Sequence, residues 1–244
     1  MAAQLTYLED PELYELDAQI VRVQPGEGEN PPVVFLDRTI FYPQGGGQPT
    51  DRGELTTASG KALVTAVSFH EGDVHHAVTA TEGELREGEQ AHLSVDGELR
   101  LMHAKLHTGG HLVMTAVDRL RKLPAVKGYH FPNGPYVEFD GVVPAEERDG
   151  FVTQVQAELD RLVAEDSEVT WRFDTVEALR AAGVHMPAET PEGKPTRVVI
   201  TSGYVSPCGG THVKKLGALT GLKVKGVKVK SGRTRVSYYI EGLG

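Results

Sequence analysis

Residues 98–123 read ELRLMHAKLHTGGHLVMTAVDRLRKL, and this stretch decides the fold because it separates two halves of different character. It contains no proline, and its apolar residues recur at helical spacing, so the pattern predicts one helix that Pro124 ends. Residues 13–95 show short strand patterns with turns, whereas helices and strands alternate after residue 123. The predicted fold class is α+β, with a small N-terminal β-barrel in residues 1–96 and an α+β domain in residues 97–244, whose helices pack on an antiparallel sheet.

The central helix carries two histidines, His107 and His111, at a spacing of four residues. Side chains at this spacing lie on one helical face, close enough to bind one ion. A second segment, Cys208-Gly209-Gly210-Thr211-His212, holds the only cysteine of the chain and repeats the four-residue spacing, with two glycines that suit a tight loop. Three imidazoles and a thiolate are ligands typical of zinc, so we predict a site of His107, His111, Cys208 and His212. The alternative is two unrelated polar clusters.

Gly109 and Gly110 interrupt this helix, where each costs about 1 kcal/mol relative to alanine. We expect the missing side chains to leave room for a substrate beside the ion. His103 precedes His107 by four residues and is interpreted as a supporting or surface residue. His130 falls in an expected turn, residues 129–135, and either lies near the site or serves the turn.

Residues 39–53 read TIFYPQGGGQPTDRG. Three consecutive glycines fit neither a strand nor a helix, so the backbone must turn sharply or approach another group closely. A long flexible hairpin loop is the alternative, but the aromatic and proline residues on both sides favour a defined loop.

The remaining elements follow from local patterns. Strands are expected at residues 16–23, 33–36, 61–69, 74–78, 91–95, 136–139, 169–173, 197–200, 222–230 and 233–240. Further helices are expected at residues 145–164 and 175–180, and the proline-rich residues 185–196 are expected to form a loop.

The net charge is −9, yet residues 213–236 contain eight basic residues and no acidic one. A basic strip on an otherwise acidic body can bind a phosphate backbone locally. The alternative is a solvated edge strand that its lysines protect from pairing. The candidates for nucleic-acid contact are Lys223, Lys225, Lys228, Lys230, Arg233 and Arg235.

A single cysteine allows no internal disulfide, no apolar run is long enough to cross a membrane, and the N-terminus lacks the pattern of a signal peptide. We therefore expect a cytoplasmic protein with no membrane contact and no evident obligate protein partner.

Together, H-T-x-x-H, C-G-G-T-H-V and F-Y-P-x-G-G-G-Q-P-x-D-x-G resemble the motifs of the AlaX family, freestanding relatives of the editing domain of alanyl-tRNA synthetase. The resemblance covers nearly the whole chain and fits the longer, barrel-bearing members, whose second part is the metal-binding editing domain also found in threonyl-tRNA synthetase. It implies a zinc-dependent trans-editing hydrolase that removes serine or glycine from mischarged alanine tRNA. The tRNA is then the partner, and Zn²⁺ is held by the two histidine and cysteine motifs.

The resemblance also implies a substrate site. Its candidates are Gln48, Thr108, Gly110, Gly209, Gly210 and Thr211. No side chain is identified as a general base, so the catalytic group is expected to be a zinc-bound water. Gly110 departs from the threonine frequent at this position in the synthetases, which leaves the choice between serine and glycine open. Two alternative functions remain, a zinc-stabilised RNA-binding module without catalysis and a metallohydrolase acting on another mischarged tRNA.

Overall fold

The computed structural model describes residues 3–186, 190 and 195–243. These residues form two compact units, Met1–Met102 and His103–Gly244, and the boundary between them falls within helix α1, Gly97–Arg121. Within the described residues, no helix combines the length and apolar character that a membrane span requires.

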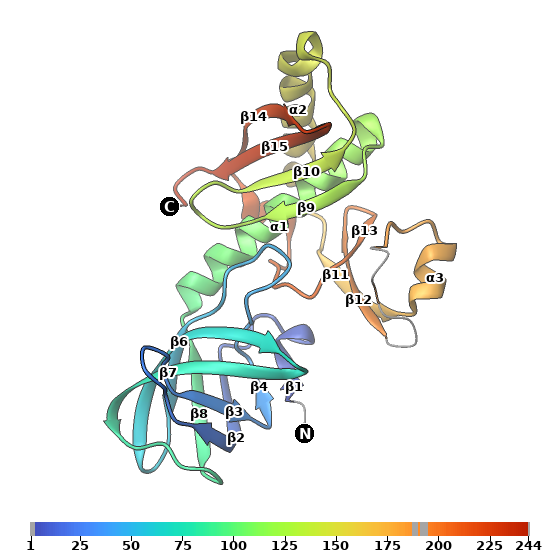
Figure 1. The fold of residues 1–244 in the computed structure, drawn as a ribbon. Helices are drawn as coiled ribbons and strands as arrows, with labels where there is room; N and C mark the ends of the chain where they lie inside the picture. The colour runs from blue at the N-terminus through green and yellow to red at the C-terminus, as the bar shows by residue number, and fades with distance from the viewer. Residues whose placement is uncertain (1–2, 187–189, 191–194, 244) are drawn as a thin grey trace. The chain divides into compact units, whose positions relative to one another are not determined.

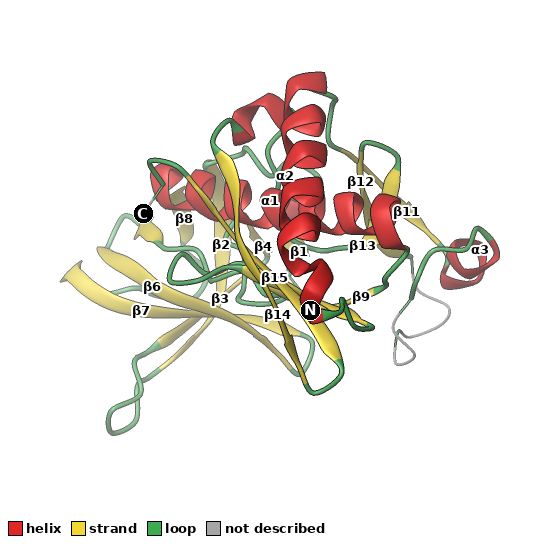
Figure 2. Ribbon diagram, turned by 90° about the horizontal axis from the view of Figure 1, so that it is seen from above, coloured by secondary structure: helices red, strands yellow, loops and turns green. Residues whose placement is uncertain are grey.

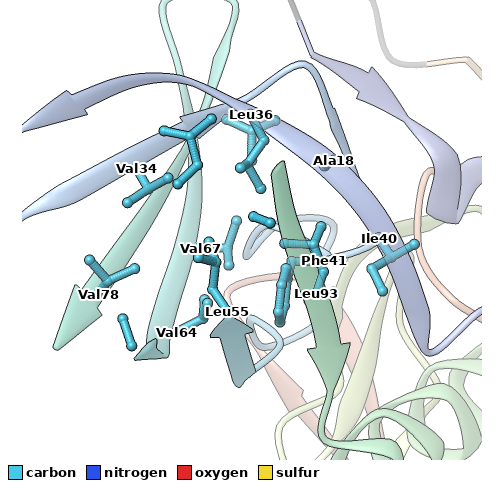
Figure 3. Close-up of a cluster of buried hydrophobic side chains, with 14 of the residues drawn as sticks. Ala18, Val34, Leu36, Ile40, Phe41, Leu55, Val64, Val67, Val78 and Leu93 are labelled. Carbon is cyan, nitrogen blue, oxygen red and sulfur yellow. The ribbon is translucent and has the colours of Figure 1, made fainter. Parts of the chain in front are cut away.

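Six antiparallel strands close into a barrel in the first unit (Figure 1). In barrel order they are β2 Glu15–Gln24, β3 Val33–Leu36, β7 Asp73–Gly83, β6 Gly60–His70, β5 Gly53–Thr56 and β8 Gln90–Val95. Strand β1, Gln4–Leu5, pairs in parallel with β4, Arg38–Thr39, and the 3-10 helix η1, Thr6–Leu8, follows β1. Inward-facing residues such as Val34, Leu55 and Leu93 are fully buried and form the apolar core of the barrel (Figure 3).

A buried ion pair holds both ends of the glycine-rich loop. Asp51 accepts hydrogen bonds from the Tyr42 backbone N–H at 2.6 Å and from Arg100 Nε at 2.8 Å. Arg100, at the beginning of α1, also donates to the carbonyl of Ile40 at 2.5 Å. Gly46 and Gly47 have φ angles of 53° and 80°, in the left-handed region that glycine adopts without strain. These contacts give a defined loop, as the sequence predicts.

The second unit contains a four-stranded antiparallel sheet in the order β14-β15-β10-β9. Its strands are β14 Leu222–Lys230, β15 Arg233–Ile240, β10 Tyr136–Asp140 and β9 Ala125–Tyr129. Helices α1 and α2, Arg148–Glu165, cover one face of this sheet (Figure 1). The side chain of Gln156 joins α2 to β14 by hydrogen bonds to the carbonyl of Leu222 and the N–H of Val224.

A three-stranded antiparallel sheet completes the second unit, with β11 Thr170–Asp174, β12 Thr196–Thr201 and β13 Tyr204–Pro207. Helix α3, Val176–Ala181, follows β11 (Figure 2). It is capped by Thr175, whose hydroxyl accepts the N–H of Ala178. Two short 3-10 helices, η2 Ala145–Glu147 and η3 Leu216–Leu219, precede α2 and β14.

The structure confirms the predicted α+β class, with a closed barrel and helices on an antiparallel sheet. The expected turn region begins later than predicted, because β9 extends to Tyr129; the sequence also gave no signal for β5 or β13. Within the expected loop at 185–196, residues 187–189 and 191–194 lie outside the described part of the chain. The division into domains at residues 96 and 97 stays a prediction.

Candidate metal centre

Four side chains from two distant segments converge in the second unit. His107 and His111 project from α1, and Cys208 and His212 come from the loop after β13. Their potential ligand atoms all lie within 4.8 Å of one another. Cys208 Sγ is 3.4 Å from His107 Nε2 and 3.3 Å from His212 Nε2, so sulfur and nitrogen atoms face a common point. The three histidines are at most 5% exposed.

Thr108 orients one of these imidazoles. Its hydroxyl donates to the carbonyl of Ala104 at 2.7 Å, as buried helical threonines commonly do. The same oxygen lies 3.1 Å from His212 Nδ1 and accepts the Val213 N–H at 3.2 Å. With the hydroxyl proton on Ala104, Nδ1 of His212 is the donor, and its Nε2 lone pair faces the cluster. A second hydrogen bond of this kind commonly fixes a metal-binding histidine.

The cysteine loop is held by Arg197 on β12. Its Nη1 donates to the carbonyls of Cys208 at 2.9 Å and Gly210 at 3.0 Å. The Gly210 N–H in turn donates to Cys208 Sγ at 3.3 Å. Arg197 is 5% exposed and lies under the ring of Trp171, 5.4 Å from its centroid. The loop shape is therefore set by a buried cation and does not depend on the glycines alone.

Burial controls protonation at this centre. Desolvation lowers the pKa of His111 to about 4 and, together with the neighbouring imidazoles and Arg197, lowers the pKa of His107 and His212 well below the ordinary value. The imidazoles are thus neutral at pH 7, the form that binds metals. Burial raises the pKa of the Cys208 thiol, although the Gly210 N–H and Arg197 oppose that shift. Nδ1 of His111 is buried without a hydrogen-bond partner.

His130 follows β9 and stacks on His107, with ring centroids 4.5 Å apart and an interplanar angle of 22°. Its Nδ1 lies 2.7 Å from the hydroxyl of Tyr238, which donates to the carbonyl of Leu106 at 2.8 Å. Burial lowers the pKa of His130 to about 3. The neutral ring therefore donates from Nδ1 to Tyr238, and His130 lies at the centre, the first of the two interpretations of this residue.

The two helical glycines allow close packing. A Cβ atom on Gly110 would lie 2.2 Å from Cε1 of His130 and 2.9 Å from the hydroxyl of Tyr238. A Cβ atom on Gly109 would lie 3.2 Å from Leu222 and 3.3 Å from Tyr238. The absence of side chains at these glycines therefore lets His130 and side chains of the sheet pack closely against α1. The expected room for a substrate beside the ion stays a prediction.

The other predicted substrate-site residues are distributed across the chain. Gln48 is fully buried in the first unit, where its backbone closes a tight bridge with Gly45. Thr108 and Thr211 are fully buried in the second unit, whereas Gly209 is exposed. Contacts of Gln48, Thr108, Gly110, Gly209, Gly210 and Thr211 with a substrate stay predictions.

The predicted nucleic-acid contacts lie on the hairpin of β14 and β15. Lys223 lies 3.7 Å from Asp160, and Arg235 forms a close pair with Glu138 at 2.6 Å. Lys225, Lys228, Lys230 and Arg233 are exposed. Two of the six cations therefore already have carboxylate partners.

Sequence reasoning missed Arg197 and Tyr238. Arg197 lies in a β-strand pattern, and nothing local separates a buried arginine from an exposed one. Tyr238 lies two residues from Val236 and from Ile240, so it faces the same buried side of β15 as they do. This spacing was the available signal for its burial.

Known proteins resemble this chain in sequence along most of its length. A family model described as "tRNA synthetases class II (A)" matches residues 12–99. The alanyl-tRNA editing protein AlaX-M of Methanosarcina acetivorans is 26% identical over 97% of this chain and 98% of its own length. AlaX-L of Pyrococcus horikoshii is 32% identical over 85% of this chain. The chain is similar in sequence to these AlaX editing proteins over most of its length.

The same region occurs within much longer proteins. The alanine–tRNA ligase of Archaeoglobus fulgidus is 29% identical over 94% of this chain, which matches 24% of the ligase. The chain likewise spans about half the length of AlaX-L. The resemblance to AlaX inferred from the three motifs is thus confirmed across both units.

Proposed function

We propose that this protein is a zinc-dependent trans-editing hydrolase, which removes serine or glycine from mischarged alanine tRNA. The observation that carries the proposal is the buried convergence of His107, His111, Cys208 and His212 in a homologue of proteins named for alanyl-tRNA editing. A synthetase pocket for alanine rejects similar small amino acids by only about 10- to 200-fold, so a second hydrolytic site has a clear purpose.

The four side chains fit a zinc ion. Bonds of about 2.3 Å to sulfur and about 2.0 Å to nitrogen at a tetrahedral angle place sulfur and nitrogen about 3.5 Å apart. The two sulfur–nitrogen distances here are 3.4 and 3.3 Å. The neutral imidazoles and the unpartnered Nδ1 of His111 also suit a cation. When bound, zinc would supply Lewis acidity at the ester carbonyl and lower the pKa of water.

Other side chains of the protein hold the four ligands in place and orient them. Thr108 fixes the tautomer of His212, Arg197 fixes the loop that carries Cys208, and His130 packs against the ring of His107. This packing buries the three histidines and keeps the ligands from reorienting. Ester hydrolysis needs no strong base beyond this, because the aminoacyl ester is already activated.

The direct test measures release of serine and glycine from mischarged alanine tRNA, before and after chelation. Correctly charged alanyl-tRNA and seryl-tRNA of the serine system are the controls. We expect metal-dependent release from the mischarged tRNA alone, and the loss of this release in a Cys208→Ala variant that keeps its fold.

Activity retained in protein shown to contain no metal would contradict the zinc mechanism. Zinc binding and tRNA binding without release from any substrate would instead favour a zinc-stabilised RNA-binding module. Release of an amino acid only from another mischarged tRNA would change the assigned substrate but would still support a metallohydrolase.

A further inference from the structure

The outer face of the four-stranded sheet carries a column of stacked side chains. The rings of Tyr129 and Phe131 have centroids 4.6 Å apart at 15°, and those of Tyr129 and Tyr136 are 5.3 Å apart at 18°. The guanidinium of Arg235 lies 3.8 Å from the centroid of Tyr136. We call Phe131, Tyr129, Tyr136 and Arg235 the aromatic column. All four side chains are half-buried.

Sheet stability accounts for only part of this column. Tyr129 and Tyr136 are directly opposite each other on β9 and β10, a pairing that commonly stabilises sheets. Phe131, however, lies beyond the end of β9 and has no cross-strand partner in the register. Among the described residues, no second ring or guanidinium covers Phe131, so the column ends in an aromatic face that another flat group can extend.

Cations lie on the same face, towards the end of the column that Arg235 forms. The strand register places Lys127 opposite Glu138 and Lys228 opposite Arg235, whereas Arg233 lies between Lys230 on β14 and Asp140 on β10. Glu138 is already paired with Arg235. In the described part of the chain, no carboxylate lies within ion-pair distance of Lys228, Lys230 or Arg233, which are all exposed. The face therefore combines flat rings with unneutralised positive charge.

The column is attached directly to the metal centre. Successive side chains of an extended segment point to opposite sides, so Tyr129 and Phe131 lie on the outer face while His130 points inward and stacks on His107. β9 is also an edge strand of the sheet. The column and His130 therefore lie on opposite sides of one edge strand, next to the metal ligands.

We propose that the aromatic column binds the unpaired nucleotides at the 3′ end of the RNA substrate, an inference that rests on the proposed function. A base stacks on the ring face of Phe131 that Tyr129 does not cover, and Lys228, Lys230 and Arg233 neutralise phosphates on the 5′ side of that base. Unpaired bases stack readily on aromatic side chains, whereas the bases of a duplex remain stacked on each other and present mainly phosphates and sugars. The column therefore positions the esterified end of the RNA beside the metal centre.

The test compares binding of two deacylated alanine tRNAs, one intact and one trimmed of its unpaired 3′ nucleotides. Fluorescence anisotropy gives Kd for the wild type, for Phe131→Ala, and for Phe69→Ala. Phe69 is a matched control, because it is 54% exposed on the barrel strand β6. Loss of one stacked base is expected to raise Kd roughly tenfold for intact tRNA in Phe131→Ala alone. Trimmed tRNA should bind the wild type and Phe131→Ala equally well.

A second arm tests the charges. The Lys228→Glu, Lys230→Glu double variant should weaken binding of both tRNAs and reduce the dependence of log Kd on log salt by a slope of about 2. An equal effect of Phe131→Ala and Phe69→Ala, or equal weakening of intact and trimmed tRNA by Phe131→Ala, would overturn the stacking proposal. Circular dichroism melting checks that each variant is folded.

The outcome is separable from that of the proposed function. If the wild-type protein releases no amino acid but shows the predicted Kd pattern, RNA binding by the aromatic column is supported and the hydrolase function is rejected. If the wild-type protein hydrolyses mischarged tRNA but Phe131→Ala leaves Kd unchanged, the hydrolase is supported and the role of the aromatic column is rejected.

Discussion

The barrel and the metal centre both bury polar side chains, but they do so in opposite ways. In the barrel, the ring nitrogens of His76 lie 2.8 Å from Thr39 Oγ1 and 3.0 Å from the carbonyl of Val34. Asp51 and Arg100 likewise form a buried pair of opposite charges. At the metal centre, nitrogen and sulfur atoms of His107, Cys208 and His212 point toward one another.

This difference distinguishes a structural site from a candidate metal-binding site. A buried group that faces its complement compensates the cost of desolvation within the protein itself. At the metal centre, the nitrogen and sulfur atoms that face each other all have lone pairs and do not complement one another. The cost of removing them from water is therefore left for a bound cation to compensate. The following predictions break one side of the comparison at a time.

The largest effect is expected at the metal centre. Cys208→Ala removes one of four ligands, so the protein should purify without zinc and lose its deacylation activity. In wild-type protein, chelating zinc from a free concentration about 1,000-fold above Kd should lower the free energy of unfolding by about 4 kcal/mol. Elemental analysis and urea unfolding measure these changes.

His92→Ala is the matched control, because His92 is an exposed histidine that pairs with Asp17 on the barrel surface. This variant should keep both zinc and activity. Equal zinc content in the Cys208→Ala and wild-type proteins would contradict the ligand assignment.

Arg100→Met breaks the complementary pair in the barrel. Asp51 then keeps a buried charge without its guanidinium, and the expected loss is about 3–5 kcal/mol in the free energy of urea unfolding. Arg86→Met removes a surface arginine 3.9 Å from Glu84 and should cost less than about 1 kcal/mol. Similar losses in the two variants would show that the buried pair does not hold the barrel.

His76 should give the barrel a dependence on pH. Burial lowers its pKa to about 4 from an ordinary value of 6.5. In the unfolded chain, His76 therefore binds a proton below about pH 6.5. In the folded chain, His76 stays neutral down to about pH 4. Stability is complete above this window and falls within it by up to about 1.4 kcal/mol per pH unit.

Urea unfolding at pH 7.5 and pH 5.5 should show this loss in the wild type and a smaller loss in His76→Gln. The difference between the two proteins isolates His76 from the other histidines. Identical losses would contradict the prediction.

Gly110→Ala is expected to cost about 1–3 kcal/mol, because the new methyl group collides with His130 and Tyr238. Gly150→Ala on α2 is the control, since its Cβ atom would meet open space and should stabilise the helix by up to about 1 kcal/mol. Thermal unfolding shows whether each variant is less or more stable than the wild type. A stabilised Gly110→Ala variant would show that His130 does not fill this space in solution.

Much of this architecture could be predicted from local patterns. The apolar periodicity of residues 98–123 predicted α1, and the spacings of its histidines and of Cys208 and His212 predicted which side chains would share a centre. Strand β9 gave no such signal, because its sequence AVKGY lacks regular alternation and contains a glycine. The sequence also gave no reason to place His130 against Gly110, since that contact depends on how β9 pairs with β10.

The sequence by itself therefore determined the helix, the alternation of the barrel strands and the four candidate ligands, because each depends on spacing within a short segment. Only the tertiary structure decided that Gly110 accommodates His130, that Arg197 is buried beneath the cysteine loop, and that three aromatic rings stack beside an edge strand. Those features depend on which distant segments pack together, and packing is set by the shape of the whole unit rather than by local periodicity.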